Sequence, residues 1–460
     1  MKLMIKKILM YAGVFLISLA IMLGFLVLSA KVSKESVREN FVESAEILCE
    51  NEVFFYMEED VEPSCIDRYA DSILLNIAYN FEPDNALKSV MWASFYTNPI
   101  KNENINFSES VNEGKEKNTQ YLRYWHGSAG IIRIFHTFLN IGQIYVIHGV
   151  LMVILFGVLI FLMVRAKCIF EAVAMGLSMV AVSIWYVPFS LEYTWVFLCM
   201  LTFSILTVIL IRKNKKKYLG VLFMLSGMVT IFLDFLTTET LTFTIPMILI
   251  LVLRKHGYTG DGADKDDILK YAEGHQMPDE KPGKRNGIRK GIKEILTYLI
   301  PWGIGYVGMW VSKWIVASLV LGENAMLYVT EHMEERIGGS IYGTDAPGSF
   351  IEYLWMAVSR NIKEIFPMDY GTGGAIIAGA LALVIAYFCF VYKHKKVEWG
   401  YIVLLLIVGF IPIVRFVILR NHSTIHFFFV HRALAGTVFA ILLSAGHLID
   451  FKIFRKSGNR

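Results

Sequence analysis

The sequence predicts an all-α, polytopic integral membrane protein with about ten transmembrane helices. Of its 460 residues, 55% are hydrophobic and 18% are charged, whereas charged residues make up about a quarter of an ordinary soluble domain. Apolar runs recur along the chain at lengths near the roughly twenty residues that a helix needs to cross a ~30 Å hydrocarbon core. The net charge is only +4, and no nucleic-acid partner is indicated.

Ten apolar runs are expected to be spans. The first follows the basic "MKLMIKK" and is longer than a signal-peptide core, so it is interpreted as a retained helix. The sixth is short and contains Pro246, which makes its boundaries the least certain. The predicted spans are 8–30, 143–164, 169–187, 193–211, 219–235, 240–253, 295–320, 373–392, 399–419 and 433–449.

The distribution of basic residues predicts the orientation. Lysine and arginine in short loops favour the cytoplasmic side, and with the N-terminus inside, the cytoplasmic segments hold well over half of the 44 basic residues. We therefore expect a multi-pass protein of the cell membrane with both termini cytoplasmic. The predicted parts are 1–30, the N-terminus and first helix; 31–142, an extracytoplasmic loop; 143–253, helices two to six; 254–293, a cytoplasmic polar linker; 294–320, helix seven; 321–371, a second extracytoplasmic loop; 372–449, helices eight to ten; and 450–460, a basic tail.

Both extracytoplasmic loops contain segments with helical periodicity. "CIDRYADSILLNIAYN" and "SFIEYLWMAVSRNIKEIF" each place apolar residues along one side, as expected for helices on the outer membrane surface. Cys49 and Cys65 lie in the first loop and could form a disulfide. Gly303, Gly305 and Gly308 in the seventh span are expected to allow close helix packing.

The first loop holds the candidate acids. If the segment after Pro63 is helical, Asp67 and Asp71 share one face, with Arg68 beside them. Paired carboxylates at a membrane surface could act as a general base or hold a divalent cation. The alternative is a solvated helix face, with Asp67 as a helix N-terminal charge.

The end of the first loop combines aromatic and cationic residues. Arg123, Tyr124, Trp125 and His126 in "LRYWHG" suit a sugar ring and a phosphate, because guanidinium binds phosphate bidentately. An aromatic belt in contact with headgroups is the alternative. Three further acids lie at predicted outer span ends: Asp234 is expected to line a site, whereas Glu192, and to a lesser degree Glu239, could simply be solvated.

The segment "RNHSTIHFFFVHR" is predicted to be outside, against the usual orientation of basic loops. Together with Arg415 inside the ninth span, its cations suit a phosphate or pyrophosphate on a lipid carrier. The alternatives are headgroup snorkelling or, for the pair at i and i+4, metal binding. The residues concerned are Arg420, His422, His426, His431 and Arg432.

This combination of loops, acids and late outer arginines resembles the GT-C superfamily of integral-membrane glycosyltransferases. That superfamily includes the protein O-mannosyltransferases and the lipid A aminoarabinose transferase, and "DRYADSILLNIA" looks like its first-loop motif. The segments "DFLT", "RYWHG" and "RNHSTIH" are also similar to those of bacterial polytopic proteins encoded with envelope polysaccharides. The resemblance implies transfer of a sugar from a polyprenyl-phosphate carrier to an extracytoplasmic envelope acceptor, with Asp67 as base and the 420–432 cations holding the phosphate.

The resemblance has one departure, because Asp67 lies well over thirty residues beyond the first helix. Either an extra helix is inserted at 33–56, or the base is one of Glu58, Glu59 and Asp60, or the likeness is topological only. No cofactor is certain, although a divalent cation is possible, and the expected partners are the polyprenyl-linked sugar and membrane lipids. A flippase, a polymerase and a non-catalytic assembly factor for lipid-linked saccharides are the alternative functions.

Overall fold

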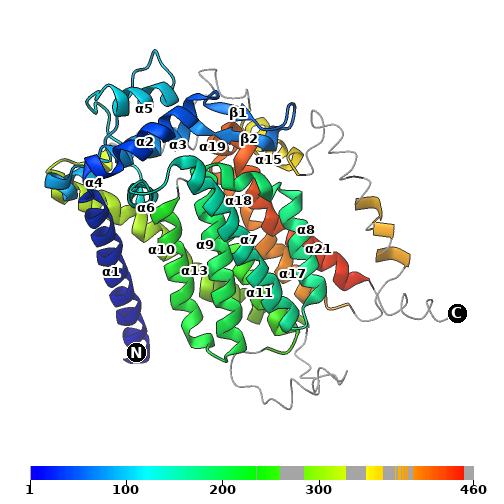
Figure 1. The fold of residues 1–460 in the computed structure, drawn as a ribbon. Helices are drawn as coiled ribbons and strands as arrows, with labels where there is room; N and C mark the ends of the chain where they lie inside the picture. Colours follow the sequence, from blue (N-terminus) through cyan, green and yellow to red (C-terminus); the bar gives the residue numbers. More distant parts are fainter. Residues whose placement is uncertain are drawn as a thin grey trace.

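A bundle of long helices carries a compact group of shorter elements at one end (Figure 1). The computed structural model of the chain describes residues 2–234, 236–258, 284–327, 349–365 and 397–449, with a few residues between 379 and 391. Helices account for 79% of the structure, and the strands β1 (Phe54–Tyr56) and β2 (Cys65–Asp67) form one small antiparallel sheet. We call residues 31–140 the head region, and the opposite end of the bundle, where α1 begins, the basal end.

The described residues contain seven helical segments long and apolar enough to cross a membrane. The membrane class predicted from the sequence is thus supported, whereas the number of about ten spans is not confirmed. Two predicted spans are short helices, α8 and α11, and the predicted span 373–392 lies mostly outside the described residues. The bundle helices are α1 (Lys2–Ala30), α7 (Ile141–Arg165), α8 (Ile169–Ala181), α9 (Leu191–Arg212), α10 (Leu219–Leu233), α11 (Leu241–Lys255), α13 (Lys284–Leu321), α17 (Trp399–Gly409), α18 (Ile411–Ile418) and α21 (Ala435–Leu448).

Helix α11 is a short helix that the rest of the protein encloses. Every residue from Leu241 to Leu253 is buried, and α11 packs against α9, α10, α17 and α21. A helix that is apolar on all sides is stable only where neighbours or lipid cover all of it. Pro246 lies within this helix, where the surrounding helices support the chain.

Glycines allow the backbones of α10 and α13 to contact each other. A Cβ atom built on Gly305 would lie 2.2 Å from the Met224 carbonyl oxygen, and one on Gly227 would lie 2.2 Å from that of Trp302. The expectation of close packing is confirmed for Gly305, and for Gly308, whose Cβ would lie 3.0 Å from the Phe15 ring. It is wrong for Gly303, which faces open space.

The head region has its own core of aromatic and aliphatic residues. Phe41 of α2 packs against Tyr79 of α3 and Phe107 of α5, with ring centroids 5.4 and 6.2 Å away. Helix α2 and strand β1 occupy the interval before Asp67, so a helix does lie in the 33–56 interval, as one of the alternatives expected. The head elements are α2 (Lys34–Cys49), β1, β2, α3 (Arg68–Tyr79), α4 (Ala86–Trp92), α5 (Glu103–Asn112) and α6 (Gly127–Phe135).

Two expectations about the loops need correction. The predicted helix in "CIDRYADSILLNIAYN" exists as α3, but almost all of its residues are buried, so it does not lie on the membrane surface. The predicted helix in the second loop exists as α15 (Phe350–Lys363). Cys49 and Cys65 are both free thiols, so the suggested disulfide is not formed.

Three buried cations of the head region and its neighbour α13 bind the carboxyl ends of helices. Arg68 donates to the carbonyls of Ile47 and Leu48 at the end of α2, at 2.6 and 3.2 Å. Cations near helix C-termini satisfy orphan carbonyls and complement the helix dipole. In the same way Arg133 donates to Ala78 and Tyr79 at the end of α3, and Lys313 to Val90 and Met91 in α4.

Candidate functional site

Asp67 lies at the junction between strand β2 and helix α3. Its Oδ1 accepts the backbone N–H of Ala70 at 2.8 Å, so Asp67 is the N-cap of α3. The N-terminal role expected as an alternative is therefore real. The residue is only 3% exposed, and burial, followed by the neighbouring Asp71 charge, raises its pKa well above the usual range.

Asp71 stabilises the start of helix α9. Its carboxylate accepts N–H bonds from Leu191, at 2.9 Å, and Glu192, at 3.3 Å, and a 2.6 Å bond from the Tyr145 hydroxyl. Burial raises its pKa to about 6, against the opposing effect of these donors. An anion at a helix N-terminus with this many donors is held as a structural group. Asp71 is thus less suited than Asp67 to proton transfer.

Glu192 completes an acidic cluster with Asp67 and Asp71. It is 8% exposed, so the expectation that it is solvated is wrong. Its carboxyl lies within hydrogen-bonding reach of that of Asp67, and its Oε2 has no other partner. Two buried carboxyls this close cannot both be ionised at low cost, so ionisation of one opposes ionisation of the other.

Asp234 and Glu239 flank the segment that joins α10 to α11. Asp234 is 1% exposed. Its carboxylate accepts a 2.6 Å hydrogen bond from the Thr237 hydroxyl and another from the Thr237 backbone N–H. Glu239 accepts a bond from the Arg415 Nε at 2.9 Å. Neither acid lies at a solvated surface, and Asp234 is close enough to Glu192 to act on its charge.

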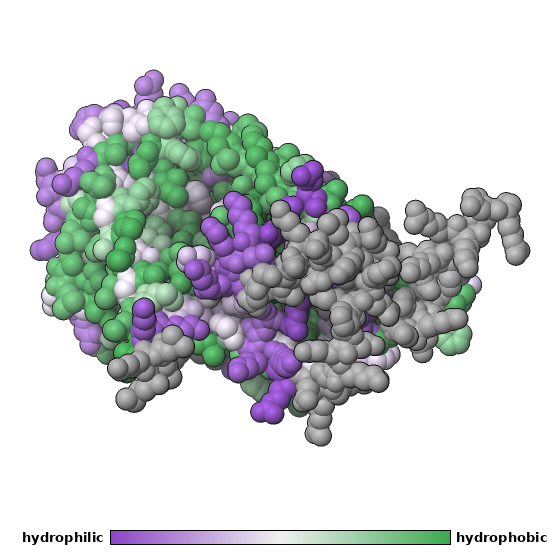
Figure 2. All heavy atoms as spheres, turned by 90° about the horizontal axis from the view of Figure 1, so that it is seen from below, coloured by the Kyte–Doolittle hydropathy of each residue, from purple (hydrophilic) through white to green (hydrophobic). Residues whose placement is uncertain are grey.

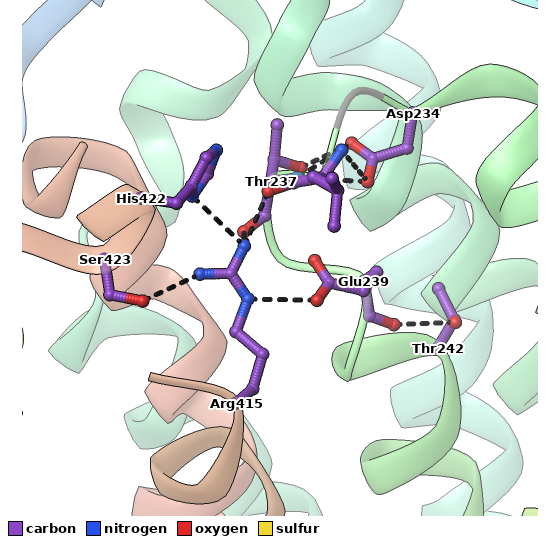
Figure 3. Close-up of polar contacts among 8 residues, drawn as sticks. Asp234, Thr237, Glu239, Thr242, Arg415, His422 and Ser423 are labelled. Atoms are coloured by element: carbon purple, nitrogen blue, oxygen red, sulfur yellow. Dashed lines mark hydrogen bonds and ion pairs between the residues drawn. The ribbon is translucent and has the colours of Figure 1, made fainter. Parts of the chain in front are cut away.

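Arg415 is the centre of a buried polar network (Figure 3). Besides Glu239 it binds the Ser423 hydroxyl at 3.1 Å and the Leu236 carbonyl at 2.6 Å. It also lies 3.3 Å from Nδ1 of His422. Because a guanidinium only donates, Nδ1 must accept, which leaves the His422 proton on Nε2.

A pocket of about 350 Å³ lies beside this network. It brings together the two segments that the sequence pointed to, since α3, Tyr121 and Arg123 form one part of its wall and residues from the 421–426 segment form another. Arg123, His422 and His426 are its basic lining residues. The full lining is Tyr69, Ile73, Phe95, Thr119, Gln120, Tyr121, Arg123, Asn421, His422, Ile425 and His426.

The other residues of the "LRYWHG" motif pack inside the protein. Trp125 is fully buried, and its Nε1 donates to the Met309 carbonyl at 2.6 Å. Tyr124 is 1% exposed and stacks on Trp310. His126 bonds the Tyr121 carbonyl at 3.0 Å, and burial lowers its pKa to about 3, so it is neutral. All three side chains are buried beside α13, and their binding of sugar or phosphate stays a prediction.

Several predicted cations also have structural partners in place of a ligand. Arg68 binds the end of α2, as described above. Arg432 is fully buried, donates to the Pro63 carbonyl at 2.6 Å and lies over the Tyr193 ring at 4.8 Å. His431 is fully buried and bonds the Phe427 carbonyl. Arg420 lies over the rings of Phe350 and Tyr353 of α15, outside the lining of the pocket.

A group of three potential metal ligands occurs elsewhere among the described residues. Cys168, Glu171 and His256 offer ligand atoms within 4.8 Å of one another, and His256 Nε2 lies 2.8 Å from the Glu171 Oε1, within hydrogen-bonding distance. His422 and His426 lie with ring centroids 4.7 Å apart, and no such group that includes them occurs in the part of the chain that the structure describes.

Comparison of the chain with protein-family models, with curated protein sequences and with solved structures gave no match. The candidate site is therefore argued from its own geometry. Sequence reasoning expected Glu192 and Glu239 to be solvated, although both are buried beside the site. Both are acids within otherwise apolar segments, a pattern that usually indicates a residue facing the protein interior.

Proposed function

We propose that this chain is a membrane-embedded glycosyltransferase of the GT-C type. It would transfer a sugar from a polyprenyl-phosphate carrier to an acceptor on the extracytoplasmic side, to which the proposal assigns the head region. The single observation that carries the proposal is the pocket shared by α3 and residues 421–426. It joins a cationic lining to the segment that bears the buried carboxyls.

The cationic lining suits the phosphate of the donor. Arg123 supplies a guanidinium, whose fork of donors matches phosphate oxygens. His422, with its proton on Nε2, supplies a directed donor that Arg415 holds in place. Such fixed donors stabilise the charge that develops on the phosphate as the sugar–phosphate bond breaks.

The Asp67 and Glu192 pair suits a general base. In the proposed step the acceptor hydroxyl oxygen bonds to the anomeric carbon and the bond from that carbon to the phosphate oxygen breaks. The hydroxyl proton passes to Asp67, and polyprenyl phosphate departs. A carboxylate with a raised pKa is a stronger base than an exposed one, and general-base catalysis typically contributes about 10²–10⁴-fold.

Binding of undecaprenyl phosphate to the purified protein tests the phosphate site. Arg123→Ala and His422→Ala are expected to weaken binding about tenfold or more, because each removes a charge-assisted or directed hydrogen bond. Arg420→Ala is the matched control, since its guanidinium does not line the pocket. Equal affinity in all three variants and the wild type would reject the assignment.

Transfer from polyprenyl-phosphate sugars tests the base. Asp67→Asn keeps an acceptor oxygen for the Ala70 N–H but cannot take a proton, so transfer is expected to fall by about 10² or more. Wild-type transfer in this variant would rule out Asp67 as base. Binding of the carrier phosphate without any sugar transfer by the wild type would instead favour transport or assembly of lipid-linked saccharides.

A further inference from the structure

Two pockets adjoin at the basal end of the bundle. One, of about 420 Å³, is lined by Lys216, Arg254, Lys290, Lys293, Glu294, Thr297 and Tyr298. The other, of about 680 Å³, is a mainly apolar groove between α1, α10 and α13 that includes Tyr11, Phe15, Met224, Ile300 and Ile304. Thr297 lines both, so the first pocket, which we call the polar chamber, and the second, which we call the apolar groove, meet at this residue.

One face of α13 forms the common wall of the two pockets. Lys290, Lys293, Thr297, Ile304 and Gly308 follow one another at steps of three, four or seven residues, which places them on one side of a helix. The face changes from cationic to apolar at Thr297. From there to Gly308 the helix rises about 16 Å, which is about half of a ~30 Å hydrocarbon core. The groove therefore matches the depth of one lipid leaflet.

The polar chamber carries an excess of positive charge. Glu294 binds Arg254 at 2.7 Å and Lys216 at 3.2 Å, while Lys290 and Lys293 add two further cations to the lining. Figure 2 shows hydrophilic atoms gathered near the middle of the basal face, with a largely hydrophobic surface on one side of them. One carboxylate cannot neutralise this lining, so an anion is favoured there.

Helix α1 closes the far side of the groove at two points. The Tyr11 hydroxyl lies against Gly220 of α10, and the Phe15 ring lies against Gly308 of α13. Lys7 adds a cation at the mouth, with its Nζ 5.9 Å from the centre of the Tyr11 ring. Ile8 and Leu16 of α1 remain exposed, so the groove is bordered by surface that contacts lipid.

We infer that the adjoining pockets bind one anionic phospholipid, with its phosphate among Lys216, Lys290 and Lys293 and one acyl chain between α1 and α13. Basic pockets between transmembrane helices are suited to anionic headgroups, and the apolar groove continues from the chamber in the direction that an acyl chain takes. The inference is independent of the proposed transferase activity, because it concerns the opposite end of the bundle.

Native mass spectrometry of the full chain with phosphatidylglycerol and phosphatidylcholine tests the charge requirement. The wild type is expected to retain phosphatidylglycerol in preference to phosphatidylcholine. Lys290→Gln/Lys293→Gln is expected to bind phosphatidylglycerol about 30-fold more weakly, at about 1 kcal/mol for each basic residue. Lys213→Gln/Lys215→Gln is the matched control, because these exposed lysines do not line either pocket. Equal retention of the two lipids by the wild type would overturn the inference.

A second pair of variants tests the acyl groove without altering charge. Ile304→Trp places a large ring in the groove and is expected to displace the lipid. Val307→Trp is not, because Val307 is equally exposed on the same helix but does not line the groove. Competition by glycerol phosphate as strong as that by phosphatidylglycerol would mean that only the headgroup binds, and would overturn the acyl part. Unchanged binding in both Ile304→Trp and the lysine variant would overturn the whole assignment.

Discussion

Basic side chains at the two ends of the bundle have opposite surroundings. At the head end Arg133, Lys313 and Arg415 are almost fully buried, and each is hydrogen-bonded to several protein oxygens. At the basal end Lys290 and Lys293 are exposed and line a pocket. The first group maintains the shape of the head region and its site, and the second is available to an external anion.

The difference shows why the number of cations in a segment is a poor guide to ligand binding. Arg432 and Arg68 lie in the two segments that the sequence singled out, yet both are bound to backbone carbonyls. Arg123, one residue from an aromatic pair, lines the pocket. A basic side chain with no carboxylate nearby in the sequence can still have its hydrogen-bond donors satisfied, because the carbonyl groups at helix ends accept them.

The largest expected effect is at Arg415. Arg415→Met leaves Glu239 buried without its ion-pair partner, so the free energy of unfolding should fall by about 3–5 kcal/mol. Denaturation of the purified protein in detergent measures this loss. In Glu239→Gln/Arg415→Met the loss should be smaller than the sum of the two single losses. Strictly additive losses would show that the two side chains do not depend on each other.

Next in size is Arg133, which joins α3 to the chain after α1. Arg133→Met removes the donors to Val32, Ala78 and Tyr79, and we expect a loss of about 2–3 kcal/mol in the same assay, as for hydrogen bonds of a charged group. Arg38→Met, at an exposed site of α2, should cost much less. Similar losses in both variants would contradict the distinction between bound and exposed cations.

A smaller effect, of the opposite sign, is expected at Asp67. Because burial raises the pKa of Asp67, and that of Asp71 to about 6, their protonated forms favour folding below about pH 4 and this contribution is lost as the pH rises through the folded pKa values. Asp67→Asn should therefore raise the free energy of unfolding at pH 8 by about 1–2 kcal/mol. Unfolding measured from pH 4 to pH 8 should show a weaker pH dependence than in the wild type. The exposed Asp84→Asn should retain the wild-type slope.

The smallest effect on stability is expected at the basal end. Lys290→Gln/Lys293→Gln should change the free energy of unfolding in lipid-free detergent by less than about 0.5 kcal/mol, since both side chains are exposed. Added phosphatidylglycerol should then stabilise the wild type and leave the variant unchanged. A large loss of stability without lipid would place these lysines with the structural cations of the head region.

The membrane class and most helix positions could be predicted from the sequence, because apolar length is a local property. The burial of α3 could not, since its polar residues are covered by α2, α5 and α6, and the sequence pattern alone resembles a surface helix. The number of spans also depends on packing. Helix α11 is short and enclosed by the protein, so length and hydropathy alone do not decide whether it counts as a span.

The candidate site was predicted in part. The sequence pointed to Asp67 and to residues 420–432, and the pocket includes neighbours of both. Glu192 was expected to be solvated because its burial depends on α3, and its backbone N–H meets a carboxylate 121 residues earlier. Trp125 was misassigned because its partner, Met309, lies 184 residues later. Such long-range contacts leave little trace in a local motif.

Lys313 also has a consequence for the order of assembly. Its ammonium group donates to Met91, which is 222 residues earlier in the chain. At 5–20 residues per second, the ribosome adds Lys313 roughly 10 to 45 s after Met91, so the carbonyls at the end of α4 have no donor from Lys313 during that time. The head region is thus among the first parts of the protein to be made and among the last to be completed.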